Sequence, residues 1–85
     1  MKDDNIELIG FVKASNYRFA VLKHLSEKSY TPTELSHLSQ INKGHISRTL
    51  KELCEKNLAI CGNDDAKKGR IYLITDKGKK VLSKL

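Results

Sequence analysis

Tryptophan is absent from this 85-residue chain, and proline (one residue) and cysteine (two residues) are rare. Two cysteines cannot build the disulfide framework of a small secreted domain, so we expect Cys54 and Cys61 to be free thiols in a reducing compartment. No run of eighteen apolar residues occurs, which argues against a membrane-spanning helix. The acidic start, Met1–Asp4, has neither the basic flank nor the cleavage site of a signal peptide. These absences predict a cytoplasmic protein without a membrane partner.

The residue patterns of catalytic and metal sites are lacking as well. There is no serine or cysteine nucleophile motif, no glycine-rich phosphate loop and no pair of carboxylates expected to converge. Cys54 and Cys61 would need one or two further ligands to hold a metal, and no cluster of histidine and aspartate has suitable spacing nearby. We therefore expect no enzyme, no metal site and no cofactor, and we expect Cys54 to pack against the core as an inert thiol.

The composition and the charge distribution favour one basic domain. Hydrophobic residues make up 39% of the chain and charged residues 31%, which fits a single domain over residues 1–85 with a modest core. The net charge of +6 is uneven: residues 1–41 hold five basic and five acidic side chains, and residues 42–85 hold eleven and five. Such an excess favours an anionic partner on one face. Nucleic acid is the commonest such partner; an anionic membrane surface and a merely solvated surface are the alternatives.

Apolar spacing and capping residues predict helices in the first third of the chain. Residues 5–14 form an apolar stretch weakened by Gly10, where we expect a short helix. Ser15 or Asn16 can cap a second helix. In the second helix, the predicted inward residues are Val21, Leu22 and Leu25, and the predicted water-facing residues are Arg18, Lys23 and Glu27. Tyr30 follows in a short extended piece.

The middle of the chain carries the clearest signal for a helix start. The segment Thr31–Glu34 predicts a capping box with proline in the first turn. The short helix that begins there should bury Leu35 and Leu38. The next four residues break the helical period, so we expect Ile41 to be buried in a turn and Asn42 to cap the following helix.

A longer helix and a β-hairpin are predicted next. From Lys43 to Lys56, apolar residues recur at helical spacing, namely Ile46, Leu50 and Leu53, with Cys54 beside them. Asn57 tolerates the left-handed conformation that ends helices. Residues 58–61 and 70–74 have the pattern of two strands joined by a polar loop, and Thr75 can cap a final helix over residues 76–85. The fold class is therefore α+β, mostly helical with a two-stranded antiparallel hairpin.

Three segments in this order have the patterns of one known fold. Leu35–Leu50 (LSHLSQINKGHISRTL) resembles a helix-turn-helix, and Lys51–Ile60 (KELCEKNLAI) resembles the entry into a wing. Ile74–Gly78 (ITDKG) is similar to the short signature that follows the wing. The chain thus resembles the winged helix-turn-helix regulators of the MarR and ArsR groups of prokaryotes. Two departures are Gln40, where glycine is common in the turn, and Ser36, where alanine is usual.

The resemblance covers residues 16–82 and carries an expected function. It implies a helix-turn-helix over residues 32–56 and a wing over residues 58–75. It also implies a transcriptional regulator that binds double-stranded DNA sequence-specifically, with helix 43–56 in the major groove. The wing, residues 62–70, would lie along the backbone or in the minor groove.

Helical geometry identifies the outward side of residues 43–56. Opposite the buried apolar residues lie Gly44, Arg48, Lys51 and Glu55, flanked by His45 and Glu52. The N-terminal part of a recognition helix normally reaches base edges, so His45 and Arg48 are the candidate base contacts. Arg48 can pair bidentately with guanine, and Gly44 leaves room for close approach.

Other polar residues suit phosphate contacts, which position a protein without reading sequence. They are Asn42, Lys43 and Ser47 at the helix edge, Thr33 in the first turn of the preceding helix, and Lys67, Lys68 and Arg70 in the wing. At Thr33 the free N–H groups and the helix dipole also favour phosphate. The alternative for each is an ordinary solvated side chain.

Winged helices also serve as protein-interaction modules in larger complexes, and some bind left-handed duplexes. The first use usually leaves the recognition helix without basic outward residues, whereas this one has Lys43, Arg48 and Lys51. The second relies on an asparagine and a tyrosine on that helix and a tryptophan in the wing, which this chain lacks. The DNA-binding regulator is therefore the leading hypothesis, and the interaction module is the alternative.

Apolar residues near the two ends predict a homodimer. They are Ile6, Leu8, Ile9, Phe11 and Val12 in the first helix and Val81, Leu82 and Leu85 in the last. This is more apolar surface than one contact with a small core needs, and exposed patches of this kind often mark an interface. The alternative is that both helices simply close the core of the monomer.

Overall fold

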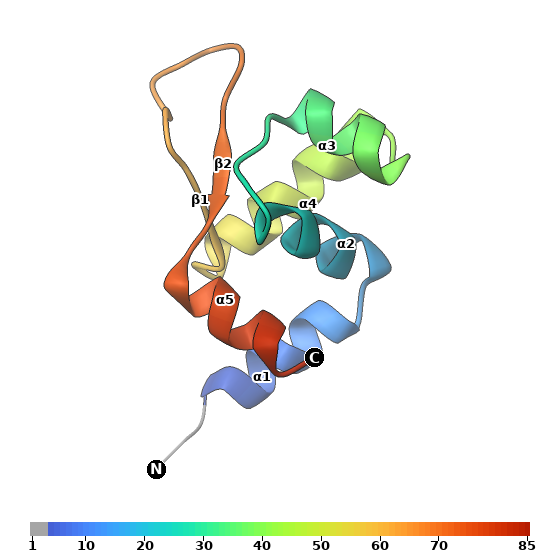
Figure 1. Ribbon diagram of the computed structural model, residues 1–85, viewed down its shortest axis with the longest axis vertical. Coiled ribbons are helices and arrows are strands. Elements are labelled where there is room, and N and C mark those ends of the chain that lie inside the picture. The colour runs from blue at the N-terminus through green and yellow to red at the C-terminus, as the bar shows by residue number, and fades with distance from the viewer. Residues whose placement is uncertain (1–3) are drawn as a thin grey trace.

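The computed structural model describes residues 4–85, so Met1–Asp3 of the acidic start lie outside the described residues. In chain order the elements are α1 (Asp4–Lys13), α2 (Asn16–Leu25), α3 (Pro32–Ser39), α4 (Lys43–Glu55), β1 (Ala59–Cys61), β2 (Tyr72–Ile74) and α5 (Asp76–Ser83). The strands form an antiparallel hairpin that projects beside α3, and α1 and α5 pack together at the opposite end (Figure 1). This is the predicted α+β winged helix-turn-helix.

The core forms where α2 and α4 pack together. The buried apolar residues of these two helices are those predicted: Val21, Leu22 and Leu25 on α2, and Ile46, Leu50 and Leu53 on α4. Leu8, Val12 and Val81 close the core from α1 and α5. Burying one leucine-sized side chain contributes about 1.5–3 kcal/mol, so these contacts fix the direction of α4 in the molecule.

Side chains fix both ends of α3, the capping box at its start and Ser36 at the turn into α4. Thr31 Oγ1 accepts from the Glu34 N–H at 3.2 Å, and Glu34 Oε1 accepts from the Thr31 N–H at 2.8 Å, which completes the predicted capping box. Gln40 ends α3 with φ of 60°, in the left-handed region where glycine is the commoner residue. Ser36 Oγ donates to the Ile41 carbonyl at 2.6 Å, so the serine found in place of alanine helps to hold the turn.

The base of the hairpin is fastened to the segment before α3. Tyr30 and Tyr72 form an antiparallel bridge, with N–H···O distances of 3.2 and 2.8 Å, which confirms the extended piece at Tyr30. The strands are three residues each, shorter than the predicted 58–61 and 70–74. Just beyond the strands the Ile71 N–H donates to the Asn63 side chain and not to a strand partner.

Helix α5 seals the hairpin against the core. Thr75 Oγ1 accepts from the Gly78 N–H at 3.0 Å, the predicted cap. A Cβ on Gly78 would overlap the Leu58 carbonyl oxygen, so only glycine allows this close approach. Asn57, at φ of 61°, turns the chain from α4 into β1 as predicted.

Two predicted side-chain positions are wrong. Leu38, expected to be buried with Leu35, is 49% exposed, because the core covers only the side of α3 that carries Leu35. Arg18, expected to face water, is half-buried and bonded to two other helices. Ile41 is partly buried and packs against the core, close to the prediction.

Candidate nucleic-acid interface

The outer side of α4 is polar and exposed. Asn42 caps the helix, with its Oδ1 accepting from the His45 N–H at 2.9 Å. The four residues predicted to face outward, Gly44, Arg48, Lys51 and Glu55, are exposed, and of the two flanking residues His45 is exposed and Glu52 is half-buried. The first turn holds no acidic residue, so the positive end of the helix dipole is not offset there. The outward side of the helix is as predicted, and its contacts with DNA stay a prediction.

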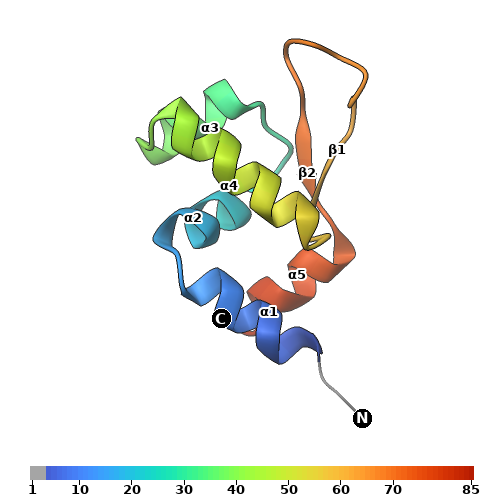
Figure 2. The ribbon, with the colours of Figure 1, turned by 180° about the vertical axis from the view of Figure 1, so that it is seen from behind.

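One groove joins the start of α3, the outer edge of α4 and the wing. It has a volume of 540 Å³ and is lined by Thr31, Pro32, Thr33, Lys43, Ser47, Lys67, Lys68, Gly69, Arg70 and Tyr72. Six of the seven residues predicted to contact phosphate therefore meet here, although three separate parts of the chain supply them. Four of the lining side chains are cationic and none is acidic. Figure 2 shows α4 from behind, running between α3 and the base of the hairpin.

The Arg70 side chain stabilises the wing loop through hydrogen bonds to two of its carbonyl groups. Its Nε donates to the Ala66 carbonyl at 2.8 Å and its Nη2 donates to the Asp64 carbonyl at 3.0 Å. The residue was predicted to contact phosphate, and two of its N–H groups are instead used within the loop. A phosphate contact by Arg70 would have to use its remaining N–H groups.

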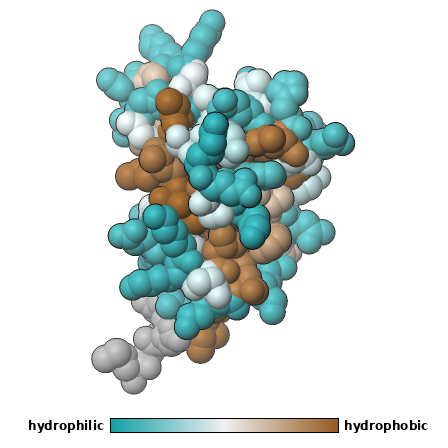
Figure 3. All heavy atoms as spheres, viewed as in Figure 1, coloured by the Kyte–Doolittle hydropathy of each residue, from teal (hydrophilic) through white to brown (hydrophobic). Residues whose placement is uncertain are grey.

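Asn63 closes the neck of the same loop. Its Oδ1 accepts from the Ile71 N–H at 2.7 Å, and its Nδ2 donates to the Gly69 carbonyl at 3.2 Å. Gly69 has φ of 65°, which favours glycine. The loop thus presents Lys67 and Lys68 on an ordered frame. In Figure 3 the tip of the hairpin is hydrophilic, while apolar surface gathers nearer its base.

Arg18 holds α4 against α1 and α2. Its Nε donates to Glu52 Oε1 at 3.1 Å and its Nη1 donates to the Phe11 carbonyl at 2.8 Å. The guanidinium also lies 3.9 Å above the centre of the Phe11 ring. Glu52 was predicted to flank the outward side of α4, and this contact draws its carboxylate away from that side. The periodicity of the sequence indicated which side of α2 carries Arg18. It did not indicate that α1 and α4 pack against that side.

Sequence reasoning missed Tyr17. This residue follows the start of α2, is 40% exposed, and places its ring 5.1 Å from the His45 imidazole, centre to centre. It extends the candidate interface from α4 onto α2. An exposed aromatic residue near a helix start was visible in the sequence, but its contact with His45 depends on how the two helices pack.

The thiols are half-buried and free. Burial raises the pKa of the Cys54 thiol, and the neighbouring Cys61 raises it further. Cys54 therefore stays protonated at neutral pH, which agrees with the expectation of a poorly reactive thiol.

Within residues 4–85 no group of three or more potential metal ligands is found. No helix in the same range has the length and apolar character needed to cross a membrane.

Solved structures share this fold, although no family model and no curated protein matches the chain. A MarR family transcriptional regulator from Silicibacter pomeroyi has a TM-score of 0.76 and 28% identity, over 92% of this chain and 54% of that one. The regulator BldR from Sulfolobus solfataricus gives 0.74 and 25%, over 82% and 51%. The reduced form of MarR from E. coli gives 0.74 and 25%, over 92% and 59%. The chain has the winged-helix fold of MarR-family transcriptional regulators.

The MarR-like fold agrees with the resemblance carried by the helix-turn-helix and wing segments. The chain spans about half the length of these regulators. The structural neighbours are transcriptional regulators, not enzymes, in line with the expected non-enzymatic role.

Proposed function

We propose that the protein is a transcriptional regulator that binds double-stranded DNA sequence-specifically. The observation that supports this most is the groove between the start of α3, α4 and the wing, which gathers four cations and no acidic side chain. A helix beside a basic hairpin suits a DNA duplex. The helix fits into the major groove, and the cations of the hairpin can contact the phosphates along its edge.

In this proposal the N-terminal half of α4 enters the major groove. His45 and Arg48 reach base edges, Gly44 allows close approach, and Lys51 lies further along the same side. The phosphate contacts are assigned to Thr33, Asn42, Lys43 and Ser47 around the helix and to Lys67 and Lys68 on the wing. Arg70 holds the wing loop in shape and is assigned a phosphate contact through its remaining N–H groups.

Binding to a random duplex should be detectable at low salt and should weaken steeply as salt rises. Each phosphate neutralised by lysine or arginine releases condensed counterions, so the four cations of the groove predict a loss on the order of a hundredfold between about 50 and about 200 mM salt. Fluorescence anisotropy with a labelled duplex at several salt concentrations measures this. Absence of binding at low salt, or a flat salt dependence, would contradict the proposal and favour the protein-interaction module.

We further propose a homodimer that reads two half-sites. Fewer apolar residues are available for a dimer interface than the sequence indicated. Most of the apolar residues of α1 and α5 pack in the core of the monomer. Leu8, Val12 and Val81 are buried, and Ile9, Phe11 and Leu82 pack against the core. Ile6, 67% exposed, and Leu85, 40% exposed, remain available at the end of the molecule where α1 and α5 pack together.

Sedimentation at micromolar concentration tests the dimer. The wild type should sediment at twice the monomer mass of 9.6 kDa. Ile6→Asp should shift it to the monomer without unfolding it, because the side chain is exposed. Leu38→Asp, which also replaces an exposed apolar residue but on α3, should leave the dimer intact. A wild type that sediments only as the monomer would rule out this part of the proposal.

A further inference from the structure

Helices α2 and α4 meet at the start of the recognition helix through an aromatic pair. The rings of Tyr17 and His45 lie 5.1 Å apart, with 50° between their planes. This is the separation and the tilted geometry of favourable ring contacts. Both residues are exposed, so the pair lies on the surface beside the base-reading side of α4 and is not part of the core.

His45 sits where recognition helices reach base edges. It is the third residue of α4, and its backbone N–H is fixed by Asn42 Oδ1. A neutral imidazole offers one donor and one acceptor, which suits a base edge. An exposed side chain free to change rotamer would lose that freedom on binding, and this loss opposes binding. A neighbouring ring that already restricts the imidazole reduces this loss.

We propose that Tyr17 is a positioning residue for base recognition, in an inference that rests on the proposed function. Its ring holds the His45 imidazole in one orientation, so that His45 discriminates one base pair near the pair read by Arg48. Within residues 4–85 the Tyr17 hydroxyl makes no hydrogen bond, so the ring and not the hydroxyl does the positioning. Base preference at that position should therefore depend on an aromatic ring at residue 17.

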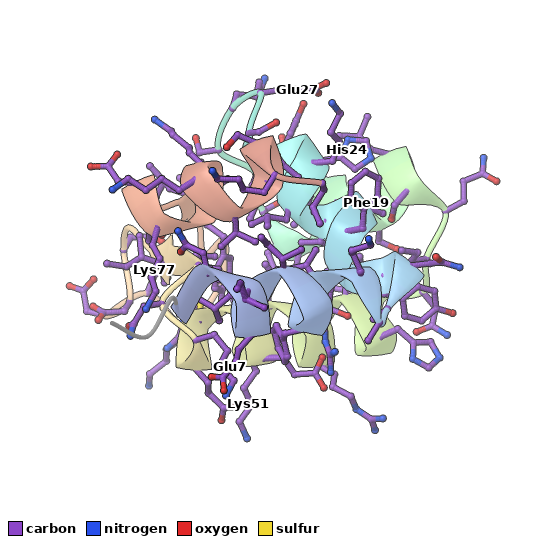
Figure 4. All side chains as sticks on the ribbon, turned by 90° about the horizontal axis from the view of Figure 1, so that it is seen from below. Glu7, Phe19, His24, Glu27, Lys51 and Lys77 are labelled. Atoms are coloured by element: carbon purple, nitrogen blue, oxygen red, sulfur yellow. The ribbon has the colours of Figure 1, made fainter. Side chains whose placement is uncertain are left out.

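The chain offers a matched control on the same helix. Phe19 is 42% exposed, close to the 40% of Tyr17. Figure 4 shows Phe19 beside His24, on the side of α2 away from Lys51 of α4. Phe19→Ala therefore removes an equally exposed ring from α2 without touching His45. The informative variants are Tyr17→Ala, Tyr17→Phe and His45→Ala.

The contact itself is measured without DNA. In NMR spectra, the ring protons of His45 should be shifted by the ring current of Tyr17. Tyr17→Ala should abolish that shift, while Tyr17→Phe and Phe19→Ala should keep it. An unchanged His45 spectrum in Tyr17→Ala would overturn the inference, because the two rings would not be in contact in solution.

The consequence for specificity is measured on a preferred duplex taken from a selection experiment and on its single-base variants. One good base contact discriminates by about 5- to 150-fold. His45→Ala should lose this preference at one position, and Tyr17→Ala should lose most of it at the same position. Tyr17→Phe, which keeps the ring, should keep the preference. The double variant should be no worse than His45→Ala, because the two residues act as one unit.

The two levels of failure are distinguishable. A wild type that binds no duplex overturns the proposed function and this inference with it. A wild type that binds, with a base preference that Tyr17→Ala leaves unchanged, overturns only the inference. An equal loss of affinity on every duplex in Tyr17→Ala also overturns it, because that pattern belongs to a phosphate contact or to a general structural effect.

Discussion

Gly44 occupies the second position of α4, on the side proposed to face DNA. A Cβ there would lie 3.4 Å from Asn42 Oδ1, an ordinary contact, and the residue does not adopt a positive φ. Neither packing nor backbone strain therefore requires glycine. Glycine in a helix interior costs up to about 1 kcal/mol relative to alanine. Close approach of another molecule is the physical reason that fits this position.

Gly44→Ala should keep or raise the free energy of unfolding and weaken duplex binding by roughly tenfold, equivalent to about 1.4 kcal/mol. The methyl group would stand between α4 and the DNA. Gly10→Ala on α1 is the control, since a Cβ there meets nothing within 4 Å. It should be stabilising without any change in affinity. Thermal unfolding and anisotropy on the same samples measure both effects, and unchanged binding by Gly44→Ala would refute the close approach.

At the scale of elements, α4 is oriented by apolar packing on one side and by a polar contact on another. The apolar residues anchor it to α2, and the contact from Arg18 to Glu52 and to the Phe11 carbonyl ties it to α1 as well. The Arg18 and Glu52 side chains are 21% and 33% exposed, so water screens their attraction only in part. Loss of Arg18 would leave a carboxylate and a carbonyl without their partner.

Arg18→Ala should lower the free energy of unfolding by about 1–3 kcal/mol, the cost of leaving partly buried polar groups unpaired. Lys23→Ala, an exposed change on the same helix, should stay within about 0.5 kcal/mol of the wild type. Urea denaturation of the two variants provides the comparison. Equal stabilities for both would show that the Arg18 contact does not hold α4 in place.

The elements also show which features the sequence could predict. The caps at Thr31, Asn42 and Thr75 depend only on the next three residues, so their sequence signals were sufficient. Arg18 and Leu38 were misplaced because their surroundings depend on how the helices pack. The same limit applies to the interface: the outward side of α4 was predictable from periodicity, whereas the contact between Tyr17 and His45 was not.

At the scale of the whole molecule, eight of the eleven basic residues of 42–85 lie in two separate places, and the other three, Arg48, Lys51 and Lys56, lie on α4 or at its end. One part lines the groove at α3, α4 and the wing. The other part comprises exposed lysines on α5 and just after it, at the opposite end (Figure 1), namely Lys77, Lys79, Lys80 and Lys84. Net charge alone therefore does not locate the DNA-binding face. The assignment depends on which cations lie beside α4. Variants that replace lysines by alanine in the wing or on α5 show which of the two ends binds DNA.

The most direct measurement compares affinities for a preferred duplex and a scrambled one, at several salt concentrations, for three variants. Arg48→Ala should cost about 1–3 kcal/mol on the preferred duplex only, because it removes a base contact. Lys67→Ala with Lys68→Ala should weaken both duplexes nearly equally and lower the salt slope by about 2. Lys77→Ala with Lys80→Ala, an equal loss of charge on α5, should leave the slope near that of the wild type. If the α5 pair carries the salt dependence while the Arg48 and wing variants bind like the wild type, α4 and the wing do not form the DNA-binding face.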